Sequence, residues 1–525
     1  MTYQRVASRW TIGAVCTALL LLACAAMLSI VQDLPAQEQA QETKTASIPA
    51  PKAVSKQETF ALRAMSPPAP HALRNRKQQR LRVHHISVKV KPAPAQAQVA
   101  PKPQAESATH ILPTFAPGTS SAVTVIGNHQ ISGAATNDMT STVCEPSVAS
   151  RDNEVLLTGN WFAAFSTNGG STFQYRNPFS MFPDSSQGGF CCDQVANYDK
   201  SHDLMCWALQ YINNSSGNTL RLAVAHGNDI AQEHWHYYDF TPQNVGNWMA
   251  EWFDFPDLVL GDSFLYVTSN VFGTADNSFK RSVVLRLPLD KLAAYQGFDY
   301  NYHSDDNFAP RATHGAHNTM YWAVHKDLAT LRIFSWPENS TSVSGPKDVG
   351  VQTWSDASRT APGPDGRDWL GREDGRITAA WMGGGTIGFA WTAAQDSNFH
   401  YPHVRVAILN TNNLTLQSQP HIWNNGFAFA YPAAAPNGQG RVGISLDFGG
   451  NTLYPSHAVG IYGDNGKWDL VSTASGRYGP ADEKWGDFLT IRPYGADPKV
   501  WVATGYTLQS GPNAGDVEVR YILFR

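Results

Sequence analysis

Short apolar runs separated by polar turns recur along the chain from residue 144 to the C-terminus. A first run follows an acidic or proline-containing turn, and a second run rich in aromatic residues follows after a tight polar turn. EVLLTGNW, SFLYVTSNVF and KVWVATGY are three of the second runs. Runs of this length bounded by Gly, Asp and Asn predict β-hairpins.

The hairpins repeat at intervals of 48 to 64 residues. The first runs start near seven positions: Glu145, Asp193, Asp257, Arg311, Asp368, Tyr431 and Asp487. Such intervals fit four-stranded propeller blades with outer loops of variable length. We therefore predict an all-β fold over residues 119–525, a β-propeller of about seven four-stranded blades, with six or eight as alternative counts. The last unit has room for three strands, and residues 121–126 are predicted to supply the fourth and close the ring.

The composition agrees with an all-β fold. The 525 residues include 16 Trp, 19 Tyr and 42 Gly, and only 16% are charged. This mixture is typical of many short strands joined by tight turns rather than of a helical bundle. The net charge of −4 does not suggest a nucleic-acid-binding protein.

The N-terminal 31 residues predict export. Arg5 and Arg9 precede an uncharged stretch over residues 12–31, which is long enough to span a bilayer. We interpret it as an uncleaved signal-anchor that holds the protein in the inner membrane facing the periplasm or cell surface. The alternatives are cleavage after the small residues around Cys24, which would give a secreted protein, and lipidation of Cys24. In all three cases the rest of the chain is exported.

Residues 32–118 are rich in Ala, Pro, Gln and Lys and have no hydrophobic periodicity. They contain 12 Lys or Arg and five Asp or Glu, so this segment is basic. We predict a disordered linker between the membrane segment and the propeller. The basic run at residues 74–82 could dock on anionic lipid or wall polymer, although a solvated spacer is the simpler interpretation.

The stretch FSTNGGSTF at residues 165–173 is the clearest local motif. It resembles the Asp-box, the S-x-D-x-G-x-T-W turn of sialidase-like (BNR) β-propellers, with Asn in place of Asp and Phe in place of Trp. The matching residues are Ser166, Asn168, Gly170, Thr172 and Phe173. The resemblance implies a structural turn on an outer hairpin, away from the central pocket. The Phe/Tyr-Arg-Ile-Pro signature of true sialidases is missing, so the resemblance implies the fold and not the catalytic roles.

Candidate chemistry gathers at the starts of the predicted blades, because propellers bind ligands where the innermost strands meet. The predicted catalytic residues are Glu145, Asp193, Asp257, Asp368 and Asp487. The predicted substrate-binding residues are Arg311, Arg372, Arg492, Trp369 and Trp485. Converging carboxylates and guanidiniums could act as acid and base or clamp an anion, and indole rings stack on sugars. Alternatively, the acids cap strand turns and the tryptophans pack between blades.

Four cysteines lie in the exported part of the chain, where disulfides persist. We predict a Cys144–Cys192 disulfide between adjacent blades. A vicinal Cys191–Cys192 bridge and a soft-metal site with His202 or Cys206 are alternatives. We predict no other metal and no cofactor, and no pattern in the sequence supports calcium.

The predicted function is recognition or hydrolysis of a glycan at the channel mouth, as in an exo-sialidase-like glycoside hydrolase. The alternatives are a non-catalytic binding or scaffold propeller, and a propeller hydrolase or lyase acting on another polyanionic or lactone substrate. The expected ligand is a glycan or another small polar molecule, and the protein is expected to be monomeric. Convergence of Arg311, Arg372 and Arg492 beside a Tyr–Glu pair would favour sialidase chemistry.

Overall fold

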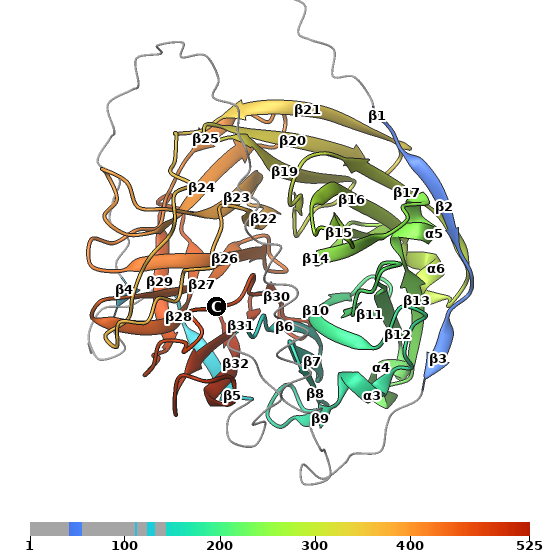
Figure 1. Cartoon of the computed structure of the whole chain (residues 1–525), viewed down its shortest axis with the longest axis horizontal. Coiled ribbons are helices and arrows are strands. Elements are labelled where there is room, and N and C mark those ends of the chain that lie inside the picture. The colour runs from blue at the N-terminus through green and yellow to red at the C-terminus, as the bar shows by residue number, and fades with distance from the viewer. Residues whose placement is uncertain (1–40, 55–110, 113–122, 132–142) are drawn as a thin grey trace, which may run out of the picture. The chain divides into compact units, whose positions relative to one another are not determined.

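The computed structural model describes residues 41–54, 111–112, 123–131 and 143–525. The predicted signal-anchor and most of the predicted linker lie outside these residues. No helix among the described residues is both long enough and apolar enough to cross a membrane. The described residues form seven β-sheets around a central axis, the blades of a propeller (Figure 1).

The first four blades each have a four-stranded antiparallel core. Blade 1 contains β6 (Ser147–Arg151), β7 (Glu154–Gly159), β8 (Phe162–Ser166) and β9 (Gln174–Arg176). Blade 2 contains β10 (Phe190–Asp199), β11 (Leu204–Tyr211), β12 (Leu220–His226) and β13 (Trp235–Phe240). Blade 3 contains β14 (Glu251–Leu260), β15 (Phe264–Gly273), β16 (Phe279–Pro288) and β17 (Phe298–Asp305). Blade 4 contains β18 (Arg311–Ala312), β19 (Thr319–Asp327), β20 (Thr330–Pro337) and β21 (Ser342–Gly350).

The last three blades complete the ring. Blade 5 contains β22 (Ile377–Gly383), β23 (Thr386–Ala393), β24 (His403–Asn410) and β25 (Leu416–Ser418). Blade 6 contains β26 (Ala428–Pro436), β27 (Val442–Gly450), β28 (Leu453–Tyr462) and β29 (Trp468–Ala474). Blade 7 contains β30 (Ile491–Pro493), β31 (Trp501–Leu508), β32 (Val517–Phe524) and β5 (Val125–Gln130). The innermost strands contact one another in sequence, and β30 contacts β6, so the ring is closed.

The closing strand comes from the N-terminal side of the propeller, as the sequence predicted. β5 pairs antiparallel with the last strand, β32, and Thr124 and Arg525 exchange backbone hydrogen bonds of 2.7 and 2.9 Å. The strand spans residues 125–130 rather than the predicted 121–126. This pairing covers the edge of β32 and joins the two ends of the propeller sequence.

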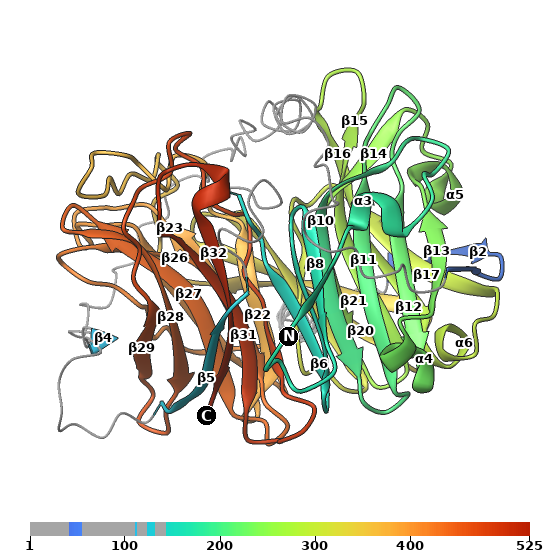
Figure 2. The ribbon, with the colours of Figure 1, turned by 90° about the horizontal axis from the view of Figure 1, so that it is seen from below.

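Part of the predicted linker forms strands instead of an irregular chain. β1 (Gln41–Glu42), β2 (Lys44–Ile48) and β3 (Lys52–Val54) pair antiparallel with the outermost strands of blades 4, 3 and 2. β4 (Ile111–Leu112) pairs parallel with β29 of blade 6. Figure 2 shows β2 on the outer side of the blades. An outermost strand offers unpaired backbone groups, and Ile48 is buried against blade 3, so even a polar segment can be held there.

The prediction for the start of blade 5 is wrong. Residues 367–373 form no strand, and the innermost strand of this blade is β22. Residues 351–376 are a long connection from blade 4 to blade 5, and Asp368 caps a turn within it. An acidic turn signal occurs in such a loop as well as before a strand, so the pattern alone did not separate the two.

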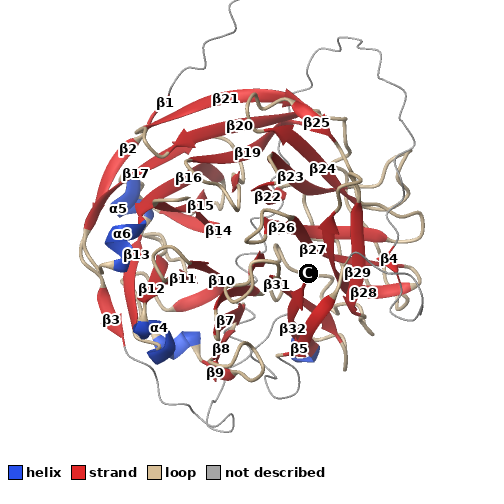
Figure 3. Ribbon diagram, turned by 180° about the vertical axis from the view of Figure 1, so that it is seen from behind, coloured by secondary structure: helices blue, strands red, loops and turns tan. Residues whose placement is uncertain are grey.

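The helices among the described residues are short and peripheral. They are α3 (Pro178–Met181), α4 (Asn228–Gln232), α5 (Pro242–Gly246), α6 (Leu289–Ala293) and the 3-10 turn η3 (Ala514–Asp516). Figure 3 shows α4, α5 and α6 beside the outer strands of blades 2 and 3. The hydrophobic core lies between the strands and between neighbouring blades, where most tryptophans are fully buried.

The FSTNGGSTF turn connects β8 to β9 and is held by hydrogen bonds within the turn. Asn168 Oδ1 accepts a hydrogen bond from the Thr172 amide (2.9 Å), and Ser166 Oγ accepts one from the Gly170 amide (3.0 Å). Gly170 has φ of +86°, which favours glycine. Because the Gly169 amide binds Asn153 in the β6–β7 turn, the motif lies at the opposite end of blade 1 from the start of β6.

Candidate functional site

The same unusual backbone occurs just before or within the innermost strands of four blades. Glu145, Phe255, Ala309 and Tyr431 each precede a proline and have φ between 48° and 56°. Positive φ at a non-glycine residue costs about 1–3 kcal/mol, and such strain gathers at functional sites. In blades 3 and 4 the residue after the proline is Asp257 or Arg311, so this backbone precedes a charged side chain within β14 and at the start of β18.

The first charged group is centred on Asp257 of β14. Arg311 Nη1 and His314 Nε2 each lie 3.3 Å from Asp257 Oδ2, and Arg492 Nη2 lies 3.7 Å from Oδ1. These side chains come from blades 3, 4 and 7 and from the turn after β18. All four are at most 9% exposed. We call these residues the Asp257 cluster.

Burial and charge act against each other in the Asp257 cluster. Burial opposes ionisation of Asp257, yet Arg311, His314 and Arg492 together hold its pKa well below the usual range. Burial and the charge of Arg492 lower the pKa of His314 to about 4, so the imidazole is neutral at pH 7. Burial lowers the pKa of Arg492 to about 10, which leaves it charged at pH 7.

The second charged group comes from the connection at residues 351–376. Arg372 Nη2 lies 3.9 Å from Asp487 Oδ1, and Arg376 Nε donates a 2.7 Å hydrogen bond to Asp374 Oδ1. The ring of Phe255 links the two groups: the guanidinium carbons of Arg376 and Arg311 lie 4.6 and 5.7 Å from its centroid. The connection and the Asp257 cluster therefore form one continuous charged site.

Glu373 differs from the other carboxyls of this site. Burial, reinforced by the charge of Asp374, raises its pKa to about 8, so Glu373 is mostly protonated at pH 7. Its Oε1 atom is buried and has no hydrogen-bond partner in the described part of the chain. Burial, together with the nearby acidic groups of Glu373 and Asp487, raises the pKa of Tyr431 well above the usual range.

Several guanidinium donors of the site also lack hydrogen-bond partners among residues 41–54, 111–112, 123–131 and 143–525. They are Arg311 Nε, Arg372 Nε and Nη1, and Arg492 Nε and Nη2. Buried donors of this kind are rare in native proteins and are normally satisfied by water or ligand. The site is therefore suited to a molecule rich in oxygen acceptors.

The structure brings most of the predicted charged residues together. Glu145 belongs to the same site, because the Asp487 amide donates to Glu145 Oε1 (3.2 Å). Arg311 and Arg492 converge on one carboxylate, whereas Arg372 pairs with Asp487. The three arginines thus do not converge on a single point.

Two predicted catalytic acids lie in different surroundings. Asp193 is fully buried in the bulge of β10. Asp368 accepts hydrogen bonds from the Ala361 and Leu370 amides (2.9 and 3.0 Å). These contacts fit the alternative interpretation of Asp368 as a turn cap.

The two tryptophans predicted to stack on a sugar have no exposed face. Trp369 and Trp485 are fully buried and lie edge to face, with 5.8 Å between ring centroids. Trp485 also stacks on Tyr506 and donates a 2.8 Å hydrogen bond to Asp447 Oδ2. The prediction of direct ligand contact therefore does not fit, and Trp369 instead anchors the connection that carries Arg372 and Glu373.

The predicted Cys144–Cys192 disulfide is wrong. The disulfide joins Cys191 to Cys192 in the bulge of β10. Cys144 is fully buried in an apolar cluster with Val148 and Phe162 and forms no disulfide within the described part of the chain. The described residues contain no group of three or more His, Cys, Asp or Glu side chains that could hold a metal ion.

Sequence reasoning missed His314 and Arg376 and did not select Glu373. A usable signal was present: RDWLGREDGR at residues 367–376 has six charged residues in ten, an unusual density inside a connection. Long ordered connections are often functional. His314 carried a weaker signal, its spacing of three residues from Arg311.

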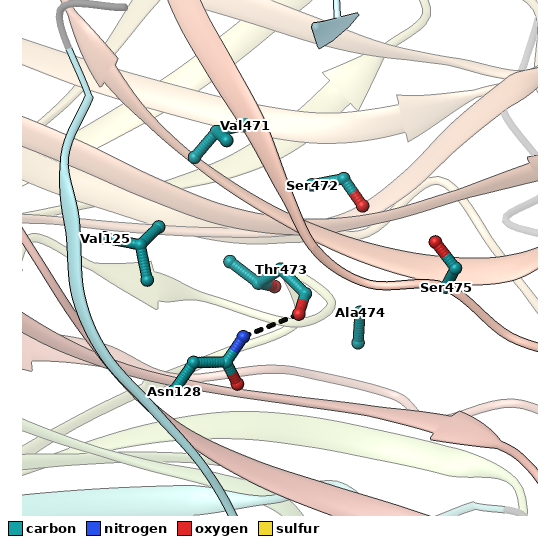
Figure 4. Close-up of a pocket in the computed structure, with 7 residues that line it drawn as sticks. All are labelled: Val125, Asn128, Val471, Ser472, Thr473, Ala474 and Ser475. Carbon is teal, nitrogen blue, oxygen red and sulfur yellow. Dashed lines mark hydrogen bonds between the residues drawn. The ribbon is translucent and has the colours of Figure 1, made fainter. Parts of the chain in front are cut away.

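A groove of about 240 Å³ lies elsewhere, between the outer strands β29 and β5 (Figure 4). It is lined by Val125, Asn128, Val471, Ser472, Thr473, Ala474 and Ser475. Asn128 Nδ2 donates a 2.7 Å hydrogen bond to the Thr473 carbonyl across it. The groove has no charged side chain and is not part of the charged site.

Comparison with known proteins adds little to this description. No family model and no curated protein matches the sequence. Among solved structures, the Penicillium chrysogenum α-L-arabinanase complexed with arabinobiose is 11% identical, with 76% of this chain and 98% of that chain covered and a TM-score of 0.38. The GH93 α-L-arabinofuranosidase of Fusarium graminearum is 10% identical (76% and 97% covered, TM-score 0.39). A Mycobacterium tuberculosis puromycin-hydrolyzing peptidase is 12% identical (75% and 52% covered, TM-score 0.37). Similarity this low supports no transfer of activity.

Proposed function

We propose that the charged site formed by the Asp257 cluster and the connection at residues 351–376 binds and hydrolyses a glycan. The observation that carries the proposal is the set of buried guanidinium donors without hydrogen-bond partners, surrounded by carboxyl groups in two protonation states. Sugar hydroxyls and ring oxygens are acceptors that would complete these hydrogen bonds. The Asp-box-like turn at residues 165–173 supports a relationship to sialidase-like propellers, and the separate pairing of Arg372 argues against sialidase specificity.

The carboxyl groups of the site suit acid–base hydrolysis. Glu373 is protonated at neutral pH and would donate its proton to the glycosidic oxygen as the C1–O bond breaks. Asp487, beside Arg372, would take a proton from the water whose oxygen forms the new bond to C1. Each turnover leaves Glu373 ionised and Asp487 protonated, and exchange with solvent restores both groups.

A panel of fluorogenic glycosides tests the proposal. In Glu373→Gln, kcat should fall by about 10²–10⁴-fold for a hydrolysed glycoside, while binding of that glycoside persists. Glu518→Gln is the matched control, because Glu518 lies on β32 of blade 7 and pairs with Arg520. Absence of both glycoside hydrolysis and glycan binding in the unmodified protein would overturn the proposal.

A non-catalytic binding propeller is the second candidate. It is favoured by Asp257, whose two oxygens are already engaged by two guanidiniums and an imidazole. Glycan binding without hydrolysis of any glycoside, in the same panel, would support this candidate over the enzyme.

We further propose that the protein is exported as a monomer and tethered through residues 12–31. The support is the uncharged stretch after Arg5 and Arg9. Fractionation of cells producing the full chain, with protease added from outside the inner membrane, tests this proposal. Recovery of protected protein in the cytosol would contradict it.

A further inference from the structure

We infer that the site takes a neutral, hydroxyl-rich sugar rather than an acidic one, because the Asp257 carboxylate already fills the anion position between Arg311 and Arg492. This inference rests on the proposed glycan function. It names the class of sugar from the contacts of the Asp257 cluster.

The position of Asp257 is that of an anion held between two guanidiniums. Oδ2 faces Arg311 Nη1 at 3.3 Å, and Oδ1 faces Arg492 Nη2 at 3.7 Å. Oδ1 also accepts a 2.9 Å hydrogen bond from the Leu258 amide. Asp257 lies at a bulge of β14 and is 2% exposed, so its carboxylate is held in the interior of the propeller.

The remaining arginines of the site also have carboxylate partners. Arg372 pairs with Asp487, and Arg376 pairs with Asp374. Each of the four arginines of the site therefore lies beside a carboxyl group. The donors of the site are thus accompanied by acidic side chains.

An acidic sugar would bring a second carboxylate next to Asp257 in a region shielded from water. Like charges placed close together in a desolvated site repel strongly. A hydroxyl group would accept from Arg311 Nε or Arg492 Nε and add no charge. The free donors thus suit neutral acceptors.

Matched fluorogenic probes test this inference: the 4-methylumbelliferyl glucoside against the glucuronide, and the galactoside against the galacturonide. Within a pair only the C6 group differs, a CH₂OH against a carboxylate. The full chain should prefer the neutral member of a recognised pair by about tenfold or more in kcat/KM or Kd. Preference for the uronide would overturn the inference and leave the glycan function standing. Failure of glycan binding altogether would overturn both.

Two further measurements test whether the charge of Asp257 causes the preference for the neutral sugar. In Asp257→Asn the anion position loses its charge, so the preference for the neutral sugar should shrink or reverse, whereas Asp262→Asn, at an exposed position, should keep it. If Asp257→Asn does not fold, the preference of the unmodified protein between the matched probes still tests the inference. Binding of the neutral probe should change little between about 50 and 500 mM NaCl, and strong weakening by salt would contradict the inference.

Discussion

Asp257 and Glu373 are both buried carboxyls of the same site, and their surroundings drive them to opposite protonation states. Asp257 sits on a rigid innermost strand between cations supplied by blades 4 and 7, and its pKa is held low. Glu373 sits on the connection at residues 351–376, where burial and the neighbouring Asp374 raise its pKa to about 8. The comparison shows that the innermost strands hold an ionised carboxylate between cations, whereas the connection holds a carboxyl group suited to donate a proton.

Removing the charge of Asp257 should have the largest effect on stability. Asp257→Asn leaves the buried Arg311 and Arg492 without their shared counterion, and the unfolding free energy should fall by about 3–5 kcal/mol. Urea unfolding measures this change. Asp262→Asn, whose partner His317 is exposed, should change it by less than about 0.5 kcal/mol. A comparable loss of unfolding free energy in both variants would show that the buried ion pairs of Asp257 contribute no more than the exposed pair of Asp262 and His317.

Removing the Trp369 side chain, which packs the connection at residues 351–376 into the core, tests the role of this connection. Trp369→Ala empties a fully buried site against Trp485 and Tyr431, and the expected loss is about 3 kcal/mol. Because the connection carries Arg372 and Glu373, glycoside hydrolysis should fall in the variant even where it remains folded. Trp423→Ala, at a half-buried position, is the control. Full activity in folded Trp369→Ala would contradict the anchoring role.

The two carboxyls should respond to pH in opposite directions. The raised pKa of Glu373 means that its contribution to stability is full below about pH 4.5 and declines as pH rises to about 8. The lowered pKa of Asp257 means that its contribution is present at neutral pH and is lost as pH falls below about 3.8. Tm measured from pH 3 to 9 in the unmodified protein and in Glu373→Gln tests the alkaline limb. The alkaline decline should be smaller in the variant, and an unchanged decline would contradict the assignment. Hydrolysis should also decline above about pH 8.

The turn at residues 165–173 should give the smallest effect, because it lies away from the charged site. Asn168→Ala removes the acceptor for the Thr172 amide, and the expected loss is about 1 kcal/mol with unchanged glycan binding. Asn168→Asp keeps that acceptor and should be close to neutral. A change in binding by Asn168→Ala would show that the two ends of blade 1 are coupled.

The sequence alone determined the repeated unit and the fold class. Alternating strands, tight turns and aromatic second runs are local properties, so the second strand of every blade was located correctly, EVLLTGNW as β7 and KVWVATGY as β31 among them. The closing strand followed from the missing fourth strand of the last blade. The turn around Asn168 was also predictable, because its hydrogen bonds join residues at most four positions apart.

Only the tertiary structure decided which charged residues meet. Asp257, Arg311 and Arg492 are separated by up to 235 positions in the sequence and are joined by ring closure. Burial makes Trp369 and Trp485 core residues rather than ligand contacts. It also raises the pKa of Glu373, which the neighbouring residues in the sequence do not predict. Protonation and convergence depend on long-range packing, whereas strands and turns depend on neighbours in the chain, and this difference separates the predictions that held from those that did not.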